Sequence, residues 1–365
     1  MAAPTADDRS TELADLAAML ADLFTVGPEP ATDEDGTVPL DAALWATLDE
    51  LGLQRLTASE SVGGSGAGWR EADVLLTAAG RSAAAVPIAE HDLLATWLLE
   101  QAGLPVDGRL RTAAVLRDGR ARWVPWARAA EAITVLIPTD DGGWGVADLD
   151  IAAVEVTPAT NLAGEPRDHI EIIGQASGTP VPAHVADDYR YRGALARALA
   201  ISGAAERIVA LVVEHATGRV QFGRPIARFQ AVQRMVSDLA CEAELARAAA
   251  EGAVEAAALS AEVGSGSDAA PTGSTPAGSP PLDPMARQAV AVAASVTGHA
   301  AAVIARNAHQ VLGAIGTTRE HELHRHTNRI LSWRSEFGPV GAWDRELLES
   351  AVAADGDVWR WMTRT

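Results

Sequence analysis

The chain has 365 residues, of which 48% are hydrophobic, and it carries a formal net charge of -20. This length allows two or three domains with a sizeable core. So strong a negative charge repels nucleic acid and anionic membranes, which argues against both as partners. The single cysteine, Cys241, rules out an internal disulfide framework, and its apolar helical surroundings predict a small core residue. With no signal-peptide pattern at the N-terminus, we expect a cytoplasmic protein.

Helices are predicted for the first domain, residues 1–107. Leucines recur at helical spacing through residues 11–24, and similar patterns follow at 40–51 and 71–85. The glycine-rich segment 61–66 lies between the last two. We interpret it as a turn, because no strand pattern precedes it and no Lys-Ser or Lys-Thr pair follows it, as a phosphate-binding loop would require.

Short β-strands are predicted for the middle domain, residues 108–187. Apolar runs at 132–138, 154–158 and 170–173 are bounded by turn residues such as Asp-Asp-Gly-Gly and Gly-Glu-Pro. Together these features predict a small β domain of four to six strands.

Long helices return in the last domain, residues 188–365. Apolar stripes at helical spacing predict them, the third running from about 284 to 312. Residues 264–283 are rich in Gly, Ser, Pro and Thr, which predicts a disordered linker. The pattern indicates an antiparallel four-helix bundle. Polar residues interrupt the apolar stretch 289–305, so we expect a buried bundle helix there and no membrane span.

Five of the nine histidines fall between residues 299 and 326 and invite a metal interpretation. The run that starts at His321 does not match H-E-x-x-H, and no cysteine or carboxylate set completes a known ligand geometry. On a helix, His321 and His324 share a face, whereas His326 points away. We therefore expect surface or interface histidines and no metal site.

Two motifs in the last domain carry a family resemblance. Residues 219–233 read RVQFGRPIARFQAVQ, which resembles the R-x-x-F-G-x-P-I-x-x-F-Q-x-V-Q signature of the acyl-CoA dehydrogenase family. Residues 310–324 read QVLGAIGTTREHELH, which resembles the family's Q-x-x-G-G-x-G-F-T-x-E-H-x-L-H. The resemblance implies a mainly α fold with a small β domain: an N-terminal helical domain, a middle β domain and a C-terminal antiparallel four-helix bundle.

The middle domain matches the family poorly. No stretch of the chain matches the family's flavin-contacting T-E-P-x-A-G-S-D. We also find no match to the G-x-K-x-W-I strand that packs near the isoalloxazine in the family. Only residues 161–168 suggest the latter part of the domain. The resemblance therefore implies a truncated middle domain and an incomplete flavin site in this chain.

The two motifs match family positions that contact the pyrophosphate and adenosine of FAD in a neighbouring subunit. The planar fork of an arginine pairs with phosphate oxygens, and glycines allow a close approach of the backbone to a diphosphate. The structural alternative is a capping arginine, bundle glutamines and turn glycines. The resemblance assigns FAD contact to Arg219, Gln221, Phe222, Gln230, Gln310, Gly313, Ala314 and Gly316.

The catalytic base is not matched. The family removes the acyl α-proton with a carboxylate while the flavin takes the β-hydride. Counting without gaps, the two family positions for this base fall on Gly193 and Phe337. Glu336 stands one residue early and serves as the base only if its loop shifts. The alternative is an ion-paired glutamate beside Arg334.

The resemblance thus points to the flavin-incomplete β subunit of an actinobacterial heteromeric α2β2 acyl-CoA dehydrogenase. A full-length α subunit would supply the middle domain and the base, and this chain would complete the shared FAD site. The substrate would be an acyl-CoA, with a steroid side-chain CoA ester as one candidate, and an electron-transfer flavoprotein would accept the electrons. Two alternatives remain open: a self-sufficient homo-oligomer that uses Glu336, and a non-catalytic scaffold subunit.

Overall fold

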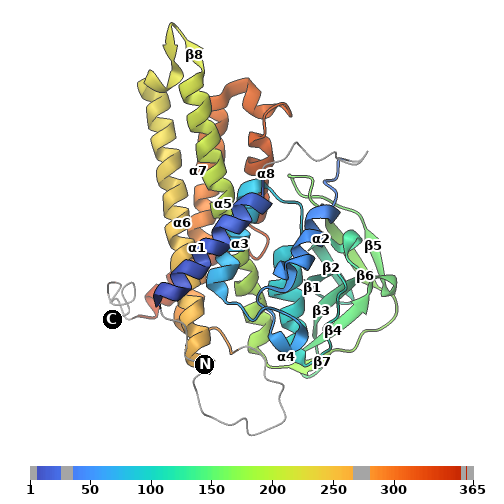
Figure 1. The fold of residues 1–365 in the computed structure, drawn as a ribbon. Helices are drawn as coiled ribbons and strands as arrows, with labels where there is room; N and C mark the ends of the chain where they lie inside the picture. The colour runs from blue at the N-terminus through green and yellow to red at the C-terminus, as the bar shows by residue number, and fades with distance from the viewer. Residues whose placement is uncertain (1–5, 26–35, 266–279, 355–358, 360–365) are drawn as a thin grey trace.

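The structure is a computed structural model that describes residues 6–25, 36–265, 280–354 and 359. Three parts follow one another along the chain (Figure 1). The first is helical and comprises α1 (Ala6–Leu23), α2 (Ala42–Glu50), α3 (Trp69–Ser82), a π-helix η3 (Ala89–Thr96) and α4 (Trp97–Ala102). The last is a bundle of α5 (His184–Gly218), α6 (Gln230–Ser265), α7 (Pro284–Leu312), α8 (Leu323–Trp333) and α9 (Val340–Val352).

The middle part contains two small sheets. One has the strand order β1-β3-β4-β7 and the other β2-β6-β5. Only the β1–β3 pairing is parallel. The strands are β1 (Arg111–Val115), β2 (Arg120–Pro125), β3 (Ala132–Pro138), β4 (Trp144–Asp150), β5 (Val154–Thr157), β6 (Arg167–Ile172) and β7 (Thr179–Val181).

Seven strands exceed the four to six that the sequence predicts. The apolar runs did identify β3, β5 and β6. Strands such as β2 were missed because Arg120 and Arg122 alternate with buried residues, so β2 contains no continuous apolar run. The prediction relied on continuous runs and therefore overlooked strands with one polar face.

The bundle is packed closely through small residues. Alanines and glycines make up about half of the buried positions of α5 and α7. Gly80 of α3 faces the backbone of Ala200 on α5, and Gly203 of α5 faces the backbone of Thr77 on α3; a Cβ on either glycine would overlap that backbone. These paired glycines bring the N-terminal helices against the bundle and fix how the first and last parts meet.

Helix α7 and the loop after it form the most apolar long segment. By length and composition, Pro284–Thr317 could cross a membrane: an 18-residue window within it has a mean hydropathy of 1.5. However, 61% of that window is buried in the fold. It packs against α5, α6, α8 and α9, as expected for a bundle helix.

Of the predicted linker, residues 266–279 lie outside the described residues. Asp283 caps α7 by accepting a hydrogen bond from the Ala286 amide (2.8 Å).

Cys241 corrects one prediction. It lies on α6 with an exposed side chain, whereas the apolar pattern predicted a core residue. The buried stripe of α6 runs through Leu239, Ala243 and Ala246, and residue 241 falls off that face.

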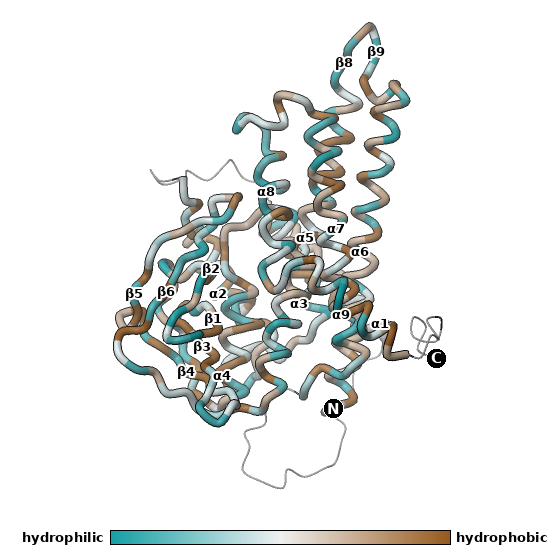
Figure 2. Tube along the Cα trace, turned by 180° about the vertical axis from the view of Figure 1, so that it is seen from behind, coloured by the Kyte–Doolittle hydropathy of each residue, from teal (hydrophilic) through white to brown (hydrophobic). Residues whose placement is uncertain are grey.

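A two-stranded hairpin, β8 (Val220–Gln221) and β9 (Arg224–Pro225), joins α5 to α6. It projects from one end of the bundle, away from the β sheets (Figure 1 and Figure 2). The loop after α7, η7 (Gly313–Thr317), lies at the same end of the bundle because α5 and α7 both run toward it. The two motifs are therefore gathered at one end of the molecule.

Candidate active site

Glu336 follows α8 and is enclosed by two arginines. Arg167 of β6 donates from Nε to one carboxylate oxygen (2.7 Å), and Arg197 of α5 donates from Nε to the other (2.5 Å). Burial opposes the charge, but the two guanidinium groups outweigh it and hold the pKa of Glu336 below its usual range. Both oxygens of Glu336 are thus engaged, and the carboxylate is a weakened base.

The same arginines extend a buried charge cluster. Arg197 also pairs with Glu90 of η3, and Arg167 pairs with Glu165 (3.1 Å), to which Arg329 of α8 also donates (3.0 Å). Three carboxylates meet three guanidinium groups, so the formal charges cancel. We call this set the charge cluster: Glu90, Glu165, Arg167, Arg197, Arg329 and Glu336.

The charge cluster connects all three parts of the chain, since its members come from η3, from β6 and the turn before it, and from the bundle. Buried charges are tolerated only where each finds partners, and Glu165 illustrates this. It also accepts hydrogen bonds from the Trp333 indole (2.8 Å) and the Asn161 amide (2.9 Å). Two neighbouring arginines lower the pKa of Glu165 to about 2, against the opposing effect of burial. The cluster is built to stay ionised.

The two family positions for the base lie in contact with each other. A Cβ on Gly193 would overlap the ring of Phe337. That ring also meets Tyr189 edge-on at 6.0 Å between centroids. A cavity bordered by Arg197, Trp333 and Phe337 has a volume of about 10 Å³, which is barely room for one water. Neither position carries a carboxylate, and no acyl group fits there.

The FAD-contact candidates lie elsewhere and are mostly exposed. The exposed set comprises Arg219, Gln221 and Phe222 in or beside the hairpin, Gln230 at the start of α6, Gln310 in the last turn of α7, and Gly313 and Ala314 just after it. Arg219 makes no ion pair within the described part of the chain, so its guanidinium donors are available. Gly313 has a φ of +65°, and a Cβ there would meet nothing within 4 Å, as expected of a glycine that ends a helix. The hydrogen-bond donors of these exposed side chains are therefore directed to the outside of the chain.

Gly316 differs from the other candidates because it is buried. A Cβ there would come within 2.8 Å of the Leu312 side chain and 3.1 Å of Leu323. Its small size is therefore required to pack η7 against α8.

Phe222 is the most exposed large apolar residue of the hairpin, with 92% of its surface accessible. Its φ of +51° turns the hairpin tightly. Phe229 lies edge-on to it at 6.1 Å, and the Arg224 guanidinium stacks over Phe229 at 4.3 Å. An aromatic group held this far out of the core is typical of a protein interface.

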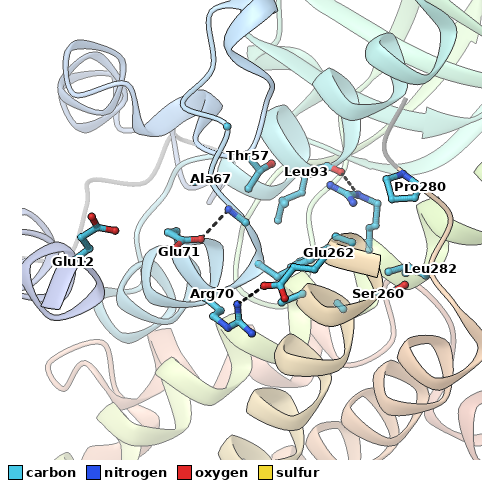
Figure 3. Close-up of a pocket in the computed structure, with 17 residues that line it drawn as sticks. Glu12, Thr57, Ala67, Arg70, Glu71, Leu93, Ser260, Glu262, Pro280 and Leu282 are labelled. Atoms are coloured by element: carbon cyan, nitrogen blue, oxygen red, sulfur yellow. Dashed lines mark hydrogen bonds and ion pairs between the residues drawn. The ribbon is translucent and has the colours of Figure 1, made fainter. Parts of the chain in front are cut away.

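A larger cavity of about 500 Å³ lies between the N-terminal helices and the end of α6 (Figure 3). Arg192 of α5 lines it. Its guanidinium stacks on Trp69 (5.1 Å) and Trp97 (4.7 Å), and Nε donates to the Leu93 carbonyl (3.0 Å). Burial lowers the pKa of Arg192 to about 10. No member of the charge cluster lines this cavity.

The hairpin end of the bundle and the interior around Glu336 differ in whether their residues suit contact with FAD. The exposed arginine, glutamines and glycine at the hairpin end suit a flavin held mainly by another subunit, because their donors are not engaged internally. Around Glu336 the charge cluster and Phe337 occupy the interior, and the residues there do not fit an isoalloxazine and an acyl thioester.

Sequence reasoning missed most of the charge cluster. Glu90, Arg197 and Arg329 belong to no motif, and only their folded positions reveal the pairing. It also missed part of a motif: Gly119, just before β2, and Trp123 within it have the spacing of G-x-K-x-W-I, with Ala121 in place of the lysine. Trp123 is 58% exposed, so this strand does present its tryptophan.

Comparisons with known proteins agree with this geometry. Residues 190–340 match the family described as acyl-CoA dehydrogenase, C-terminal domain. Acyl-CoA dehydrogenase FadE34 of Mycobacterium tuberculosis is 28% identical over 331 residues, which cover 86% of this chain and 43% of that protein. Acyl-CoA dehydrogenase IpdE2 of the same organism is 30% identical over 215 residues, covering 57% and 64%. The chain thus spans less than two thirds of the length of these relatives.

Solved structures share the fold along almost the whole chain. The ChsE4-ChsE5 complex from Mycobacterium tuberculosis has a TM-score of 0.74 at 22% identity, with 96% of this chain and 98% of that chain covered. A variant of the Tcur3481-Tcur3483 steroid ACAD has a TM-score of 0.75 at 20% identity, with 95% and 99% covered. Residues 190–340 thus match the acyl-CoA dehydrogenase C-terminal domain, and the chain as a whole shares the fold of these solved structures.

Proposed function

We propose that this chain is the flavin-completing subunit of a heteromeric, cytoplasmic acyl-CoA dehydrogenase. In an α2β2 assembly, a full-length dehydrogenase subunit would hold FAD and supply the base. The observation that carries the proposal is the state of Glu336, whose two oxygens are both bound by buried arginines. A general base must reach the α-proton of the substrate with a free carboxylate oxygen. Glu336 has none, so we do not assign it that role.

The hairpin end supports the second half of the proposal. Arg219 and Gln310 would contact the FAD pyrophosphate and adenosine from across the subunit interface, with Gln221, Gln230, Gly313 and Ala314 beside them. When bound, FAD accepts the β-hydride of the acyl thioester. The residues of this chain would orient the cofactor and cover it from water. Phe222 would pack against the partner subunit.

The substrate and the electron acceptor are proposed from similarity. One similar structure is described as a steroid ACAD and another as a two-component ChsE4-ChsE5 complex. These favour a bulky acyl-CoA, such as a steroid side-chain CoA ester, dehydrogenated between its α and β carbons. An electron-transfer flavoprotein would then accept the electrons from the reduced flavin.

The test is flavin retention in the assembled complex. The chain is co-expressed with its full-length dehydrogenase partner, and FAD per complex is measured after extensive dialysis for wild type, Arg219→Ala and Gln310→Ala. We expect both variants to assemble and to lose FAD more readily, because phosphate and adenosine contacts are removed. Arg234→Ala is the control, since Arg234 is exposed on α6 and 3.9 Å from Asp238 alone. Unchanged flavin content in both variants would favour a scaffold role.

A further inference from the structure

We infer that the cavity beside Arg192 binds an uncharged, mainly apolar molecule through a carbonyl oxygen. This Arg192 cavity, of about 500 Å³, is the one shown in Figure 3. Its walls come from the N-terminal helices and their loops, from α5, from the end of α6 and from the residues just before α7. More than half of the lining residues are apolar or glycine, which is typical of a small-molecule site of this volume. The apolar wall includes Ala67, Trp69, Leu93, Ala257, Ala258 and Leu282.

Arg192 brings hydrogen-bond donors to the cavity that the described part of the chain does not use. Its Nε donates to the Leu93 carbonyl (3.0 Å), and its guanidinium group stacks on Trp69 (5.1 Å) and Trp97 (4.7 Å). Among the described residues, Nη1 and Nη2 donate no hydrogen bond and no carboxylate forms an ion pair with Arg192. The two indoles fix the guanidinium group by cation–π contact, so these donors are held in place. A ligand oxygen would supply the acceptor.

The charges near Arg192 favour an uncharged ligand. Three carboxylates offset its positive charge from a distance: Asp92, Asp188 and Glu100. In the wall itself, three carboxylates stand against two guanidinium groups. These five residues are Glu12, Glu71, Glu262, Arg70 and Arg192. An anionic ligand would be repelled by this surplus of carboxylates, whereas a carbonyl oxygen accepts hydrogen bonds from the guanidinium group and adds no charge.

The Arg192 cavity is separate from the residues of the proposed function. No member of the charge cluster lines it, and neither do Gly193, Phe337 or the FAD-contact candidates. An acyl-CoA carries several phosphate charges, which the acidic wall disfavours. We therefore expect a smaller ligand, with a hydrocarbon or aromatic body and one ketone, ester or amide group. The inference does not depend on the proposed function.

The test is a displacement titration of the purified full chain with three naphthalenes of nearly equal size. 2-Acetylnaphthalene carries a carbonyl group, 2-naphthoate carries a carboxylate, and 2-ethylnaphthalene carries neither. Each displaces Prodan, a fluorescent naphthyl ketone whose emission shifts to shorter wavelengths in apolar surroundings. We expect saturable Prodan binding at one site, and tighter binding of 2-acetylnaphthalene than of 2-naphthoate. Arg192→Met removes the donors but keeps an apolar stem beside the indoles. It should weaken 2-acetylnaphthalene binding about tenfold and leave 2-ethylnaphthalene binding unchanged.

A second pair of variants locates the binding site. Ala261→Phe fills the cavity from an exposed position of α6 and should weaken the binding of all three naphthalenes. Ala248→Phe makes the same change at an exposed position of α6 that does not line the cavity, and it should bind as the wild type does. Thermal unfolding checks that each variant folds, and Ala261→Phe decides the matter if Arg192→Met does not fold.

Three results would overturn the inference. The first is that Prodan does not bind at micromolar concentrations, which would leave the cavity to water. The second is that 2-naphthoate binds more tightly than 2-acetylnaphthalene. The third is that folded Ala261→Phe binds the naphthalenes as tightly as the wild type, or that folded Arg192→Met weakens 2-acetylnaphthalene no more than 2-ethylnaphthalene.

Discussion

Gly193 and Phe337 occupy one another's space: the ring of Phe337 fills the volume that any side chain at Gly193 would need. These are the two positions at which the family resemblance places a catalytic base. Neither position carries a carboxylate, and the space around both is closed. Restoring a carboxylate at residue 193 alone would produce a collision with the ring before it produced an active site.

The first prediction concerns this packing. Gly193→Ala should destabilise the fold by about 1–3 kcal/mol, because the Phe337 ring must shift in a full interior. Gly252→Ala is the matched control: Gly252 also lies in a long helix, but nothing lies within 4 Å of a Cβ there. It should gain up to about 1 kcal/mol from helix propensity. Chemical denaturation measures the unfolding free energy of both variants. An equal increase in stability for the two would show that the Phe337 ring moves aside without cost.

The second prediction separates stability from catalysis at Glu336. Glu336→Gln leaves two buried guanidinium groups short of a charged partner and should cost about 3–5 kcal/mol of unfolding free energy. Glu155→Gln, at an exposed position of β5, should change little. Turnover of the assembled complex, measured well below its melting temperature, should be retained in Glu336→Gln. Loss of turnover with intact assembly would assign Glu336 as the base.

The third prediction concerns pH and Glu165. Its folded pKa of about 2 lies below the ordinary value of 4.5, so its stabilisation is present above pH 4.5 and is lost as pH falls toward 2. The difference corresponds to about 3 kcal/mol. Urea unfolding of wild type and Glu165→Gln should differ most near neutral pH and converge in acid. A difference that stays constant down to pH ~2.5 would contradict an ionised Glu165.

The fourth prediction concerns the hairpin. Phe222→Ala should leave the isolated chain as stable as before, because the side chain is 92% exposed. It should weaken assembly with the partner about tenfold or more, as expected for a central aromatic of an interface. Leu162→Ala, which removes a 63% exposed apolar side chain near the β sheets, is the control. Sedimentation over a concentration series distinguishes them, and equal assembly would place the interface elsewhere.

Much of the fold could be predicted from local patterns. The helix expected at 284–312 matches α7, and the run at 132–138 matches β3, because buried elements have continuous or periodic apolar residues. Cys241 was predicted to be buried, but it lies on the exposed side of α6. The spacing of apolar residues locates the buried face of a helix only approximately, so a residue at the edge of that face is easily misassigned. Strand β2 was missed because one of its faces is polar, so its sequence contains no continuous apolar run.

The site was less predictable, for a physical reason. The motifs located Arg219 and Gln310 because the family resemblance rests on short contiguous signatures. The charge cluster depends on residues as distant as Glu90 and Glu336, and an isolated glutamate or arginine in a sequence gives no sign of its partner. The sequence could place Glu336 near the family's base position, but only the fold shows that Arg167 and Arg197 hold it.

The most direct test of the central claim is the visible absorption spectrum of the chain purified alone, recorded with its mass in solution. If another subunit must hold the flavin, the isolated chain is colourless, and it becomes part of a yellow complex only when co-expressed with a full-length dehydrogenase. A yellow homo-oligomer with about one FAD per chain would contradict the account, since the interior around Glu336 would then have to open for the cofactor.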